Sequence, residues 1–251
     1  MLKKLFFFIL FIGVINTNAQ VLNIEHLRIA NDTTGFAGSI GVNLQLIKNT
    51  RDIFIFGNTI YAQYRNQKHL LFLINNISYK KIDEDDIINK GTMHLRYNYK
   101  LNDIVSLEAF GQLQYNTISK IKSRQLIGGG TRFKLSEKEK YKFYLGTIFM
   151  HEYEKIDENP YIYNTDYRFS GYISFRFFPT ESFTLTSTTF YQPRLDRFND
   201  YRIYNQNSLS LRIIKKLSLQ LTYIISYDAF PAEGIPKTQY ELFNGLVYTF
   251  D

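Results

Sequence analysis

From Gly35 to the end of the chain, apolar and polar residues alternate one for one in a succession of short segments. In one of them, Leu107 and Leu113 stand on the odd positions while Glu108 and Gln112 stand between them. Because consecutive side chains of a strand point to opposite faces, this period of two predicts strands with one apolar and one polar face.

Twelve such segments can be marked out, and most have the length of about 9 to 11 residues that a tilted strand needs to cross a bilayer. The predicted strands cover residues 35–48, 53–66, 69–81, 91–101, 104–119, 124–135, 141–155, 167–178, 183–192, 201–214, 217–227 and 239–250.

The N-terminus has the layout of a secretory signal peptide. Lys3 and Lys4 precede an apolar run over residues 5–15, and Ala19 offers a cleavage site before Gln20. The run is too short for a helix across a hydrocarbon core of roughly 30 Å, which disfavours the alternative of an uncleaved anchor. We expect residues 1–19 to be removed and residues 20–34 to form a periplasmic lead-in, as a short extra strand or a plug, before a single barrel domain over residues 35–251.

Composition supports a membrane barrel and disfavours several other classes. Aromatic residues make up 17% of the chain, a content typical of barrels with interfacial girdles. Beyond the signal there is no run of 18 apolar residues, so closed strands are the expected way to cross a bilayer. There is no cysteine, and removing Lys3 and Lys4 from 30 basic residues against 23 acidic ones leaves a charge of only +5, which disfavours a nucleic-acid partner.

The connections form a second pattern, because bacterial barrels have short periplasmic turns and longer external loops. The joints after even strands are short, whereas residues 82–90, 156–166, 193–200 and 228–238 predict external loops. The first of these loops is acidic, with Asp83, Glu84, Asp85 and Asp86 in a row. The sequence therefore predicts an all-β fold, a 12-stranded antiparallel outer-membrane barrel with both termini in the periplasm. In strands two and three the alternation is spoiled by several apolar residues, which either pack inside or mark a slip in register; they are Ile53, Ile55, Leu70, Phe72 and Ile74.

The last strand ends in a pattern similar to the insertion signal of outer-membrane barrels. Gly245, Tyr248 and Phe250 fit a glycine followed by two alternating aromatic residues. This ending predicts recognition by the barrel-assembly machinery and a final location among outer-membrane lipids. An ordinary aromatic-rich last strand is the alternative.

Several stretches together resemble one family, that of the salt-induced outer-membrane proteins, whose function is unknown. The likeness covers most of the mature chain and is carried by GFAGSIGVNL from Gly35, the turn at Lys48, HLRYNYKLND from His94, and the Gly128 to Gly130 run; the Ala19-Gln20 junction is similar to exported proteins of Bacteroidetes. The resemblance implies a barrel fold and an outer-membrane location, and it implies no catalytic residues.

Alternation also predicts which charged side chains line the lumen. The predicted interior set is Arg96, Lys100, Arg132, Lys134, Arg168, Arg176, Arg202 and Arg212, against Glu108, Glu152, Glu154 and Glu241. An isolated ion in a low dielectric is costly, so these groups must be hydrated or paired. Two interpretations of this set are possible. The lumen is either a small water-filled pore with a mild preference for anions, or it is plugged by an internal network of Arg/Glu ion pairs.

No catalytic motif is present, and no cofactor is expected. None of the four histidines is followed two positions later by serine, the pattern of barrel acyl hydrolases. A surface hydrolase that uses Asp85, Asp86 and His151 is the alternative, as is Ca²⁺ held by the acidic run, which lacks EF-hand spacing. Gly128, Gly129 and Gly130 lack the Lys-Ser/Thr of a phosphate loop and indicate a bulge or close backbone approach that could leave space on the inner wall. The leading hypothesis is a non-enzymatic outer-membrane protein, either a narrow channel for small solutes or an envelope-stress structural protein.

Overall fold

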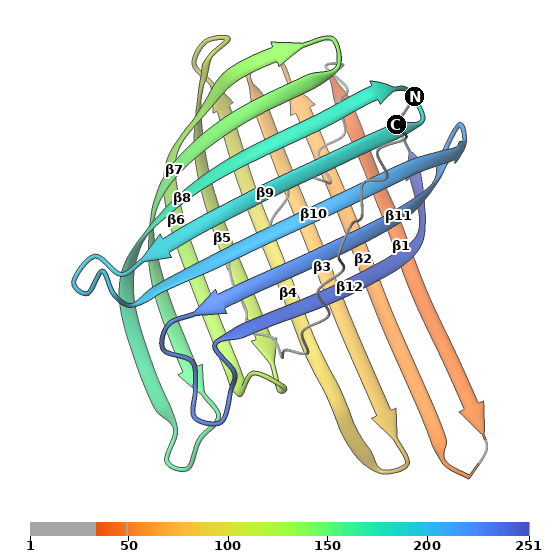
Figure 1. The fold of residues 1–251 in the computed structure, drawn as a ribbon, viewed down its shortest axis with the longest axis vertical. Coiled ribbons are helices and arrows are strands. Elements are labelled where there is room, and N and C mark those ends of the chain that lie inside the picture. The colour runs from red at the N-terminus through yellow and green to blue at the C-terminus, as the bar shows by residue number, and fades with distance from the viewer. Residues whose placement is uncertain (1–33, 49, 251) are drawn as a thin grey trace, which may run out of the picture.

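The computed structural model describes residues 34–48 and 50–250, and these form one closed barrel of 12 antiparallel strands (Figure 1). Each strand pairs with its neighbour in the chain, and β12 pairs with β1 to close the ring. The predicted fold class and strand number are confirmed. The predicted signal peptide and all of the predicted lead-in except Thr34 lie outside the described residues.

The strands account for most of the described chain. Their bounds are β1 Gly35–Lys48, β2 Asp52–Asn66, β3 His69–Ile82, β4 Asp85–Lys100, β5 Val105–Asn116, β6 Ile121–Lys138, β7 Tyr141–Ile156, β8 Ile162–Thr180, β9 Phe183–Pro193, β10 Tyr201–Ile214, β11 Leu217–Asp228 and β12 Thr238–Phe250. The described residues contain no helix long and apolar enough to cross a membrane.

Short turns gather at the end of the barrel where β1 begins and β12 ends, which we call the turn end; the opposite end is the loop end. The longest connections, residues 194–200 and 229–237, lie at the loop end as predicted. The prediction of a long acidic loop over residues 82–90 is wrong. Asp83 and Glu84 alone form the turn, and β4 already begins at Asp85, because pairing with β3 continues past a register shift at Ile87 and sets Asp86 opposite Lys81 and Asp85 opposite Ile82.

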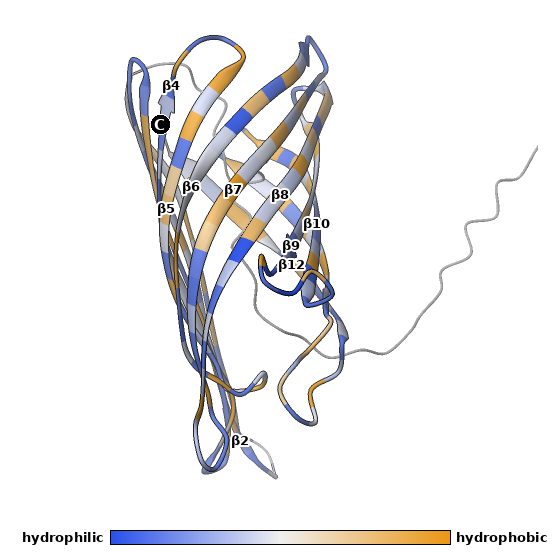
Figure 2. Cartoon of the chain, turned by 90° about the vertical axis from the view of Figure 1, so that its left-hand side faces the viewer, coloured by the Kyte–Doolittle hydropathy of each residue, from blue (hydrophilic) through white to orange (hydrophobic). Residues whose placement is uncertain are grey.

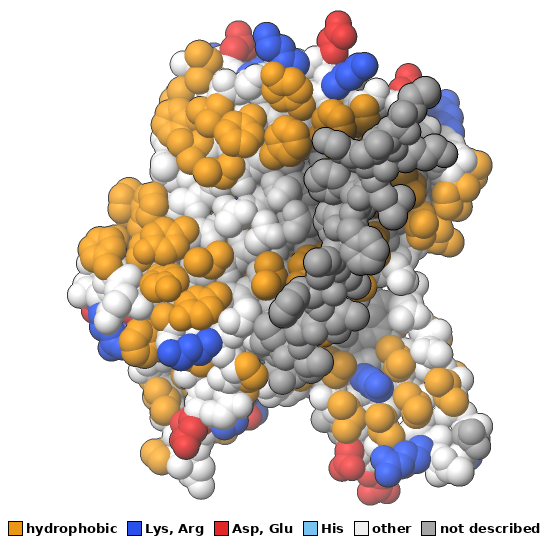
Figure 3. Space-filling view, in the orientation of Figure 1, with side chains coloured by type: hydrophobic (Ala, Val, Ile, Leu, Met, Phe, Trp, Pro, Cys, Tyr) orange, Lys and Arg blue, Asp and Glu red, His pale blue; other side chains and the backbone are white. Residues whose placement is uncertain are grey.

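The hydropathy of the residues changes back and forth along the strands (Figure 2), and successive side chains lie on opposite faces of the wall. On β5, Leu107 and Leu113 are exposed on the outside while Glu108 and Gln112 are buried on the inside. In Figure 3 hydrophobic side chains spread over the outer face, and charged ones gather toward the two ends. Such an outer surface is suited to hydrocarbon, and its polar interior is not.

The early strands that break the alternation place their apolar residues inside. Leu70, Phe72 and Ile74 are buried and form a cluster with Tyr61 of β2. Their neighbour Leu71 is exposed on the outer face. For Leu70, Phe72 and Ile74 the first of the two sequence interpretations is therefore correct, and the pairing runs through these residues without a register shift; Ile53 and Ile55 of β2 are half-buried.

The closure of the barrel is its least paired seam. Within the described chain, residues 38–40 of β1 pair with residues 248–250 of β12 and the pairing goes no further. By contrast, β1 pairs with β2 along its whole length. Toward the loop end β1 and β12 diverge (Figure 1), and side chains on both faces of β1 become exposed, including Asn43 and Gln45 on the inner face and Leu44 on the outer.

The seam can be tested with engineered cysteines, because the chain has none of its own. Ser39 and Thr249 are direct partners, so Ser39→Cys with Thr249→Cys should form a disulfide that shifts mobility on non-reducing gels. Asn43→Cys with Gly245→Cys is the matched control, since these positions would be partners if the pairing continued, and it should stay reduced. Cross-linking of the control pair with equal efficiency would contradict the open seam.

Candidate functional site: the barrel interior

The interior near the loop end holds a network of buried ion pairs centred on Glu152 of β7. Its carboxylate accepts from Arg168 Nε at 3.0 Å and from Arg202 Nη1 at 2.6 Å, and it forms an ion pair with Arg124, whose Nε lies 3.0 Å away. Arg124 also pairs with Glu154. All five side chains are at least 93% buried. Three guanidiniums on one carboxylate offset the cost of burying each charge alone.

Further carboxylates complete this network at its rim. Asp228 accepts from Arg202 Nε at 2.8 Å, and Asp200 accepts from Arg168 Nη2 at 3.1 Å. Asp166 lies 3.4 Å from Arg168 and 3.1 Å from Arg194. Because the network takes its residues from β6, β7, β8, β10, β11 and the loop before β10, it ties together one side of the wall at the loop end.

A second polar group lies deeper, around Glu108 of β5. Tyr172 of β8 donates to Glu108 Oε2 at 2.8 Å, which joins two strands that have β6 and β7 between them. Asn98 also donates to Glu108, and Arg96 Nη1 lies 3.5 Å from it. Next to this group an apolar cluster fills the interior; its members are Phe110, Leu126, Ile148, Met150, Tyr172, Phe190 and Tyr204. The sector from β5 to β10 is therefore packed with side chains.

The opposite sector of the interior is more open. Lys90 of β4 and Glu241 of β12 form an ion pair at 2.8 Å, and their side chains stay 25% and 23% exposed. In the ring, β3, β2 and β1 lie between these two strands, so the pair reaches across the lumen. Thr59 and Asn43, which face inward from β2 and β1, are exposed. Water can therefore reach this sector, which we call the hydrated sector.

The predicted interior residues lie in four places. Half of them are buried in the networks above: Arg96, Glu108, Glu152, Glu154, Arg168 and Arg202. Glu241 pairs with Lys90 in the hydrated sector. Arg132, Lys134, Arg176 and Lys100 line a cavity at the turn end. Arg212 differs, because its side chain is 46% exposed beside Glu181 at 3.5 Å and does not line that cavity.

Sequence reasoning missed several members of the loop-end network. Arg124 has the same parity as Arg132, so alternation could have placed it inside, but it stood at the edge of a predicted strand. Asp166 and Asp228 were assigned to loops, although β8 begins at Ile162 and β11 ends at Asp228. His94, also on the inner face, is buried, stacks on Phe110 and bonds Gln112 through Nδ1 at 2.8 Å.

The glycine run of β6 marks close contact and leaves no space. A Cβ at Gly128 would lie 2.7 Å from the Phe110 ring and 2.9 Å from Met150 Cβ, and one at Gly130 would collide with the carbonyl of Thr147. The expectation of extra room on the inner wall is wrong, because aromatic and aliphatic side chains occupy it. The interpretation of these glycines as positions of close backbone approach agrees with this packing.

The residues of the hydrolase hypothesis do not meet in one site. Asp85 begins β4, whereas His151 lies on β7 with β5 and β6 between them. His151 stands between the inward Met150 and Glu152 and packs against Tyr167, with 5.1 Å between ring centroids. Asp83 instead bonds the backbone N–H of Asp52 at 2.8 Å and so links two hairpins. In the described parts of the chain, no three His, Cys, Asp or Glu side chains gather as metal ligands.

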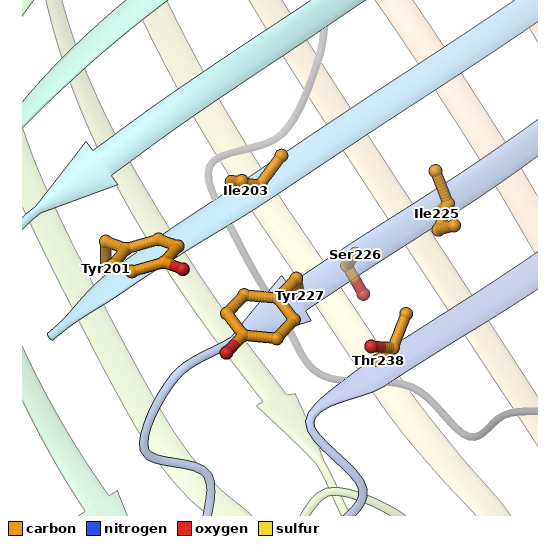
Figure 4. Close-up of a pocket in the computed structure, with 6 residues that line it drawn as sticks. All are labelled: Tyr201, Ile203, Ile225, Ser226, Tyr227 and Thr238. Carbon is orange, nitrogen blue, oxygen red and sulfur yellow. The ribbon is translucent and has the colours of Figure 1, made fainter. Parts of the chain in front are cut away.

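A hollow of about 290 Å³ also lies on the outer face, over β10, β11 and β12 (Figure 4). Tyr201 and Tyr227 stack there at 5.5 Å beside Ile203 and Ile225. The exposed surface of the hollow is mostly apolar, and its tyrosines and isoleucines look outward, as in the aromatic girdles of barrels. On β12, Gly245 and Tyr248 are exposed, and the backbone of Phe250 pairs with Gly38; their role as an insertion signal stays a prediction.

Comparison with known proteins agrees with this architecture. The model of a family described as "Protein of unknown function, DUF481" matches residues 37–250. The chain belongs to the DUF481 family. The predicted membership of an unknown-function barrel family is thereby confirmed. No curated protein matches this DUF481 chain.

Among solved structures, the DUF481 barrel resembles outer-membrane porins. The NanC porin is 8% identical, with 86% of this chain and 100% of that chain covered and a TM-score of 0.52. A KdgM porin is 11% identical, with 86% and 99% covered and a TM-score of 0.45. At these identities the likeness concerns the fold alone.

The Glu152 network of this DUF481 barrel should dominate its stability. Glu152→Gln leaves three buried guanidiniums without their shared carboxylate, so we expect a loss of about 3 to 5 kcal/mol in the free energy of unfolding. Urea titration of the refolded protein in micelles measures it. Glu181→Gln is the control, because Glu181 is almost fully exposed beside Arg212 and should change stability little. Equal effects of both variants would contradict the central role of Glu152.

Proposed function

We propose that this DUF481 protein is a non-enzymatic outer-membrane barrel that lets small solutes pass through the hydrated sector of its interior. The outer location is supported by the signal-like N-terminus, the apolar outer face and the resemblance of the fold to porins. The main support for a passage is the difference in packing between two sectors of the barrel interior. One sector is packed, while the sector between β4 and β12 keeps exposed polar side chains and has an ion pair across it.

The pair between Lys90 and Glu241 is the expected constriction of this passage. Its two groups point at each other from strands on different parts of the wall, and neither is packed as tightly as the Glu152 network. Charged side chains at a narrow point set which ions cross, because a mobile ion interacts with them at short range. Conduction through this sector must therefore be sensitive to the sign of charge at these two residues.

Single-channel recordings in planar bilayers under a KCl gradient test this passage. Glu241→Gln leaves the positive charge of Lys90, so the reversal potential should move toward anion selectivity; Lys90→Gln leaves Glu241 and should move it toward cation selectivity. Glu181→Gln, far from the hydrated sector, should leave the reversal potential unchanged.

Two results would reject the proposal. If the refolded wild-type protein gives no conductance steps, the protein has a structural role in the envelope and no passage. If steps occur but both variants shift the reversal potential in the same direction or leave it unmoved, ions do not pass the Lys90 and Glu241 pair.

A further inference from the structure

A cavity of about 220 Å³ lies inside the barrel at the turn end. Gln67 and Lys68 of the β2–β3 turn and Asn102 and Asp103 of the β4–β5 turn stand at its rim, and strands from β2 to β9 supply its wall. The Glu108 group borders its inner side, since Arg132 lies 4.0 Å from Glu108 and also lines the cavity. The cavity therefore lies between the turns at this end of the barrel and the Glu108 group inside it, and we call it the vestibule.

The lining of this vestibule is strongly cationic. Two of its side chains are acidic and seven are basic, the latter being Arg65, Lys68, Lys100, Arg132, Lys134, Lys142 and Arg176. Both carboxylates are engaged with lysines at the rim: Asp103 with Lys100 at 2.7 Å, and Glu137 with Lys134 at 2.6 Å and with Lys142. The hydrogen bond and charge of Lys100 lower the pKa of Asp103. The lining keeps five more positive than negative groups.

The arginines of the vestibule reach it from different parts of the wall. Arg65 lies on β2 and Arg176 on β8, six strands apart in the ring of 12 and thus on opposite sides, while Arg132 lies on β6. The guanidinium of Arg132 lies over the ring of Tyr144, 3.5 Å from its centroid. Stacking holds one flat face of a guanidinium and leaves its N–H edge directed sideways, the geometry that binds carboxylate and phosphate in a bidentate way.

We infer that this vestibule binds a small soluble solute that carries carboxylate or phosphate groups, with Arg132 and Arg176 as its principal ligands and Arg65 facing them. Hydroxyl and amide groups of Ser106, Ser174 and Asn98 also line the cavity and provide neutral hydrogen-bond partners. Typical ligand pockets have roughly 300 to 1,000 Å³, so the solute is smaller than most. This inference deepens the proposed passage by naming its solute class.

Isothermal titration of the full mature protein, refolded in neutral detergent at low ionic strength, measures the binding. Sodium succinate and sodium phosphate are the two probes, and glycerol is the uncharged comparison. We expect saturable binding of at least one anion, weaker at high salt, and no binding of glycerol. Binding of succinate alone identifies a carboxylate site, and binding of phosphate alone identifies a phosphate site.

Variants locate the site. Arg132→Gln and Arg176→Gln should each raise Kd about tenfold or more, because each removes charge-assisted hydrogen bonds to the anion. Arg132→Lys keeps the charge and loses the planar fork, so its Kd should lie between those of wild type and Arg132→Gln. Arg212→Gln is the matched control at the same end of the barrel, outside the cavity, and should leave Kd unchanged. Heat-modifiable migration on gels checks that every variant folds.

Absence of saturable binding for both anions would overturn the site, and so would an Arg212→Gln effect as large as that of Arg132→Gln, since binding would then follow overall charge. The assay needs no conductance. Binding without conductance steps therefore leaves the anion site standing and rejects the passage, whereas conductance without binding rejects the anion site alone.

Discussion

Pairing of every strand with two neighbours is the constraint on which this barrel depends. A wall with an apolar outer face can satisfy its backbone N–H and C=O groups in lipid only through the next strand. Eleven of the junctions meet this demand over long stretches, and the closure between β1 and β12 meets it over residues 38–40 and 248–250. The closure of the ring therefore depends on a short contact between the two ends of the sheet.

Closure also dictates where charge can go. Because the outer face is apolar, the alternation leaves arginines and carboxylates mainly the interior, where each must find a partner or water. The protein uses both solutions. Glu152 gathers three arginines in the packed sector, whereas Lys90 and Glu241 remain partly exposed in the hydrated sector. The same chemistry thus produces a rigid wall on one side and an accessible lumen on the other.

The sequence predicted the parts of this arrangement that depend on local pattern. A period of two is enough to place Arg96, Arg168 and Arg202 on the inner face, because each side chain's direction follows from its parity on the strand. The period of two does not show where a strand ends. Asp166 and Asp228 fit a continued alternation, but they were assigned to loops. The acidic run at Asp85 was misassigned for the same reason, since pairing with β3 extends β4 beyond the clear pattern.

Contacts across the lumen lie beyond any local pattern. Lys90 and Glu241 are 151 residues apart in the chain, and only the order, stagger and closure of the strands bring them together. The cavity at the turn end likewise depends on β2 and β8 standing on opposite walls. Parity predicted that Arg132 and Arg176 face inward, but it could not distinguish these residues from Arg212, which has a similar position at the end of a strand and remains exposed beside Glu181.

The incomplete seam and the hydrated sector occupy the same side of the barrel, and the two have a common cause. A side chain becomes buried inside a barrel when strands on both sides bring neighbours against it. Where β1 and β12 separate, Asn43 and Gln45 have no neighbours on the β12 side and stay exposed. The inner face beside the adjacent strands is open there as well. The ion pair between Lys90 of β4 and Glu241 of β12 spans this space. It therefore links the strands on the two sides of the region in which β1 and β12 have no backbone pairing.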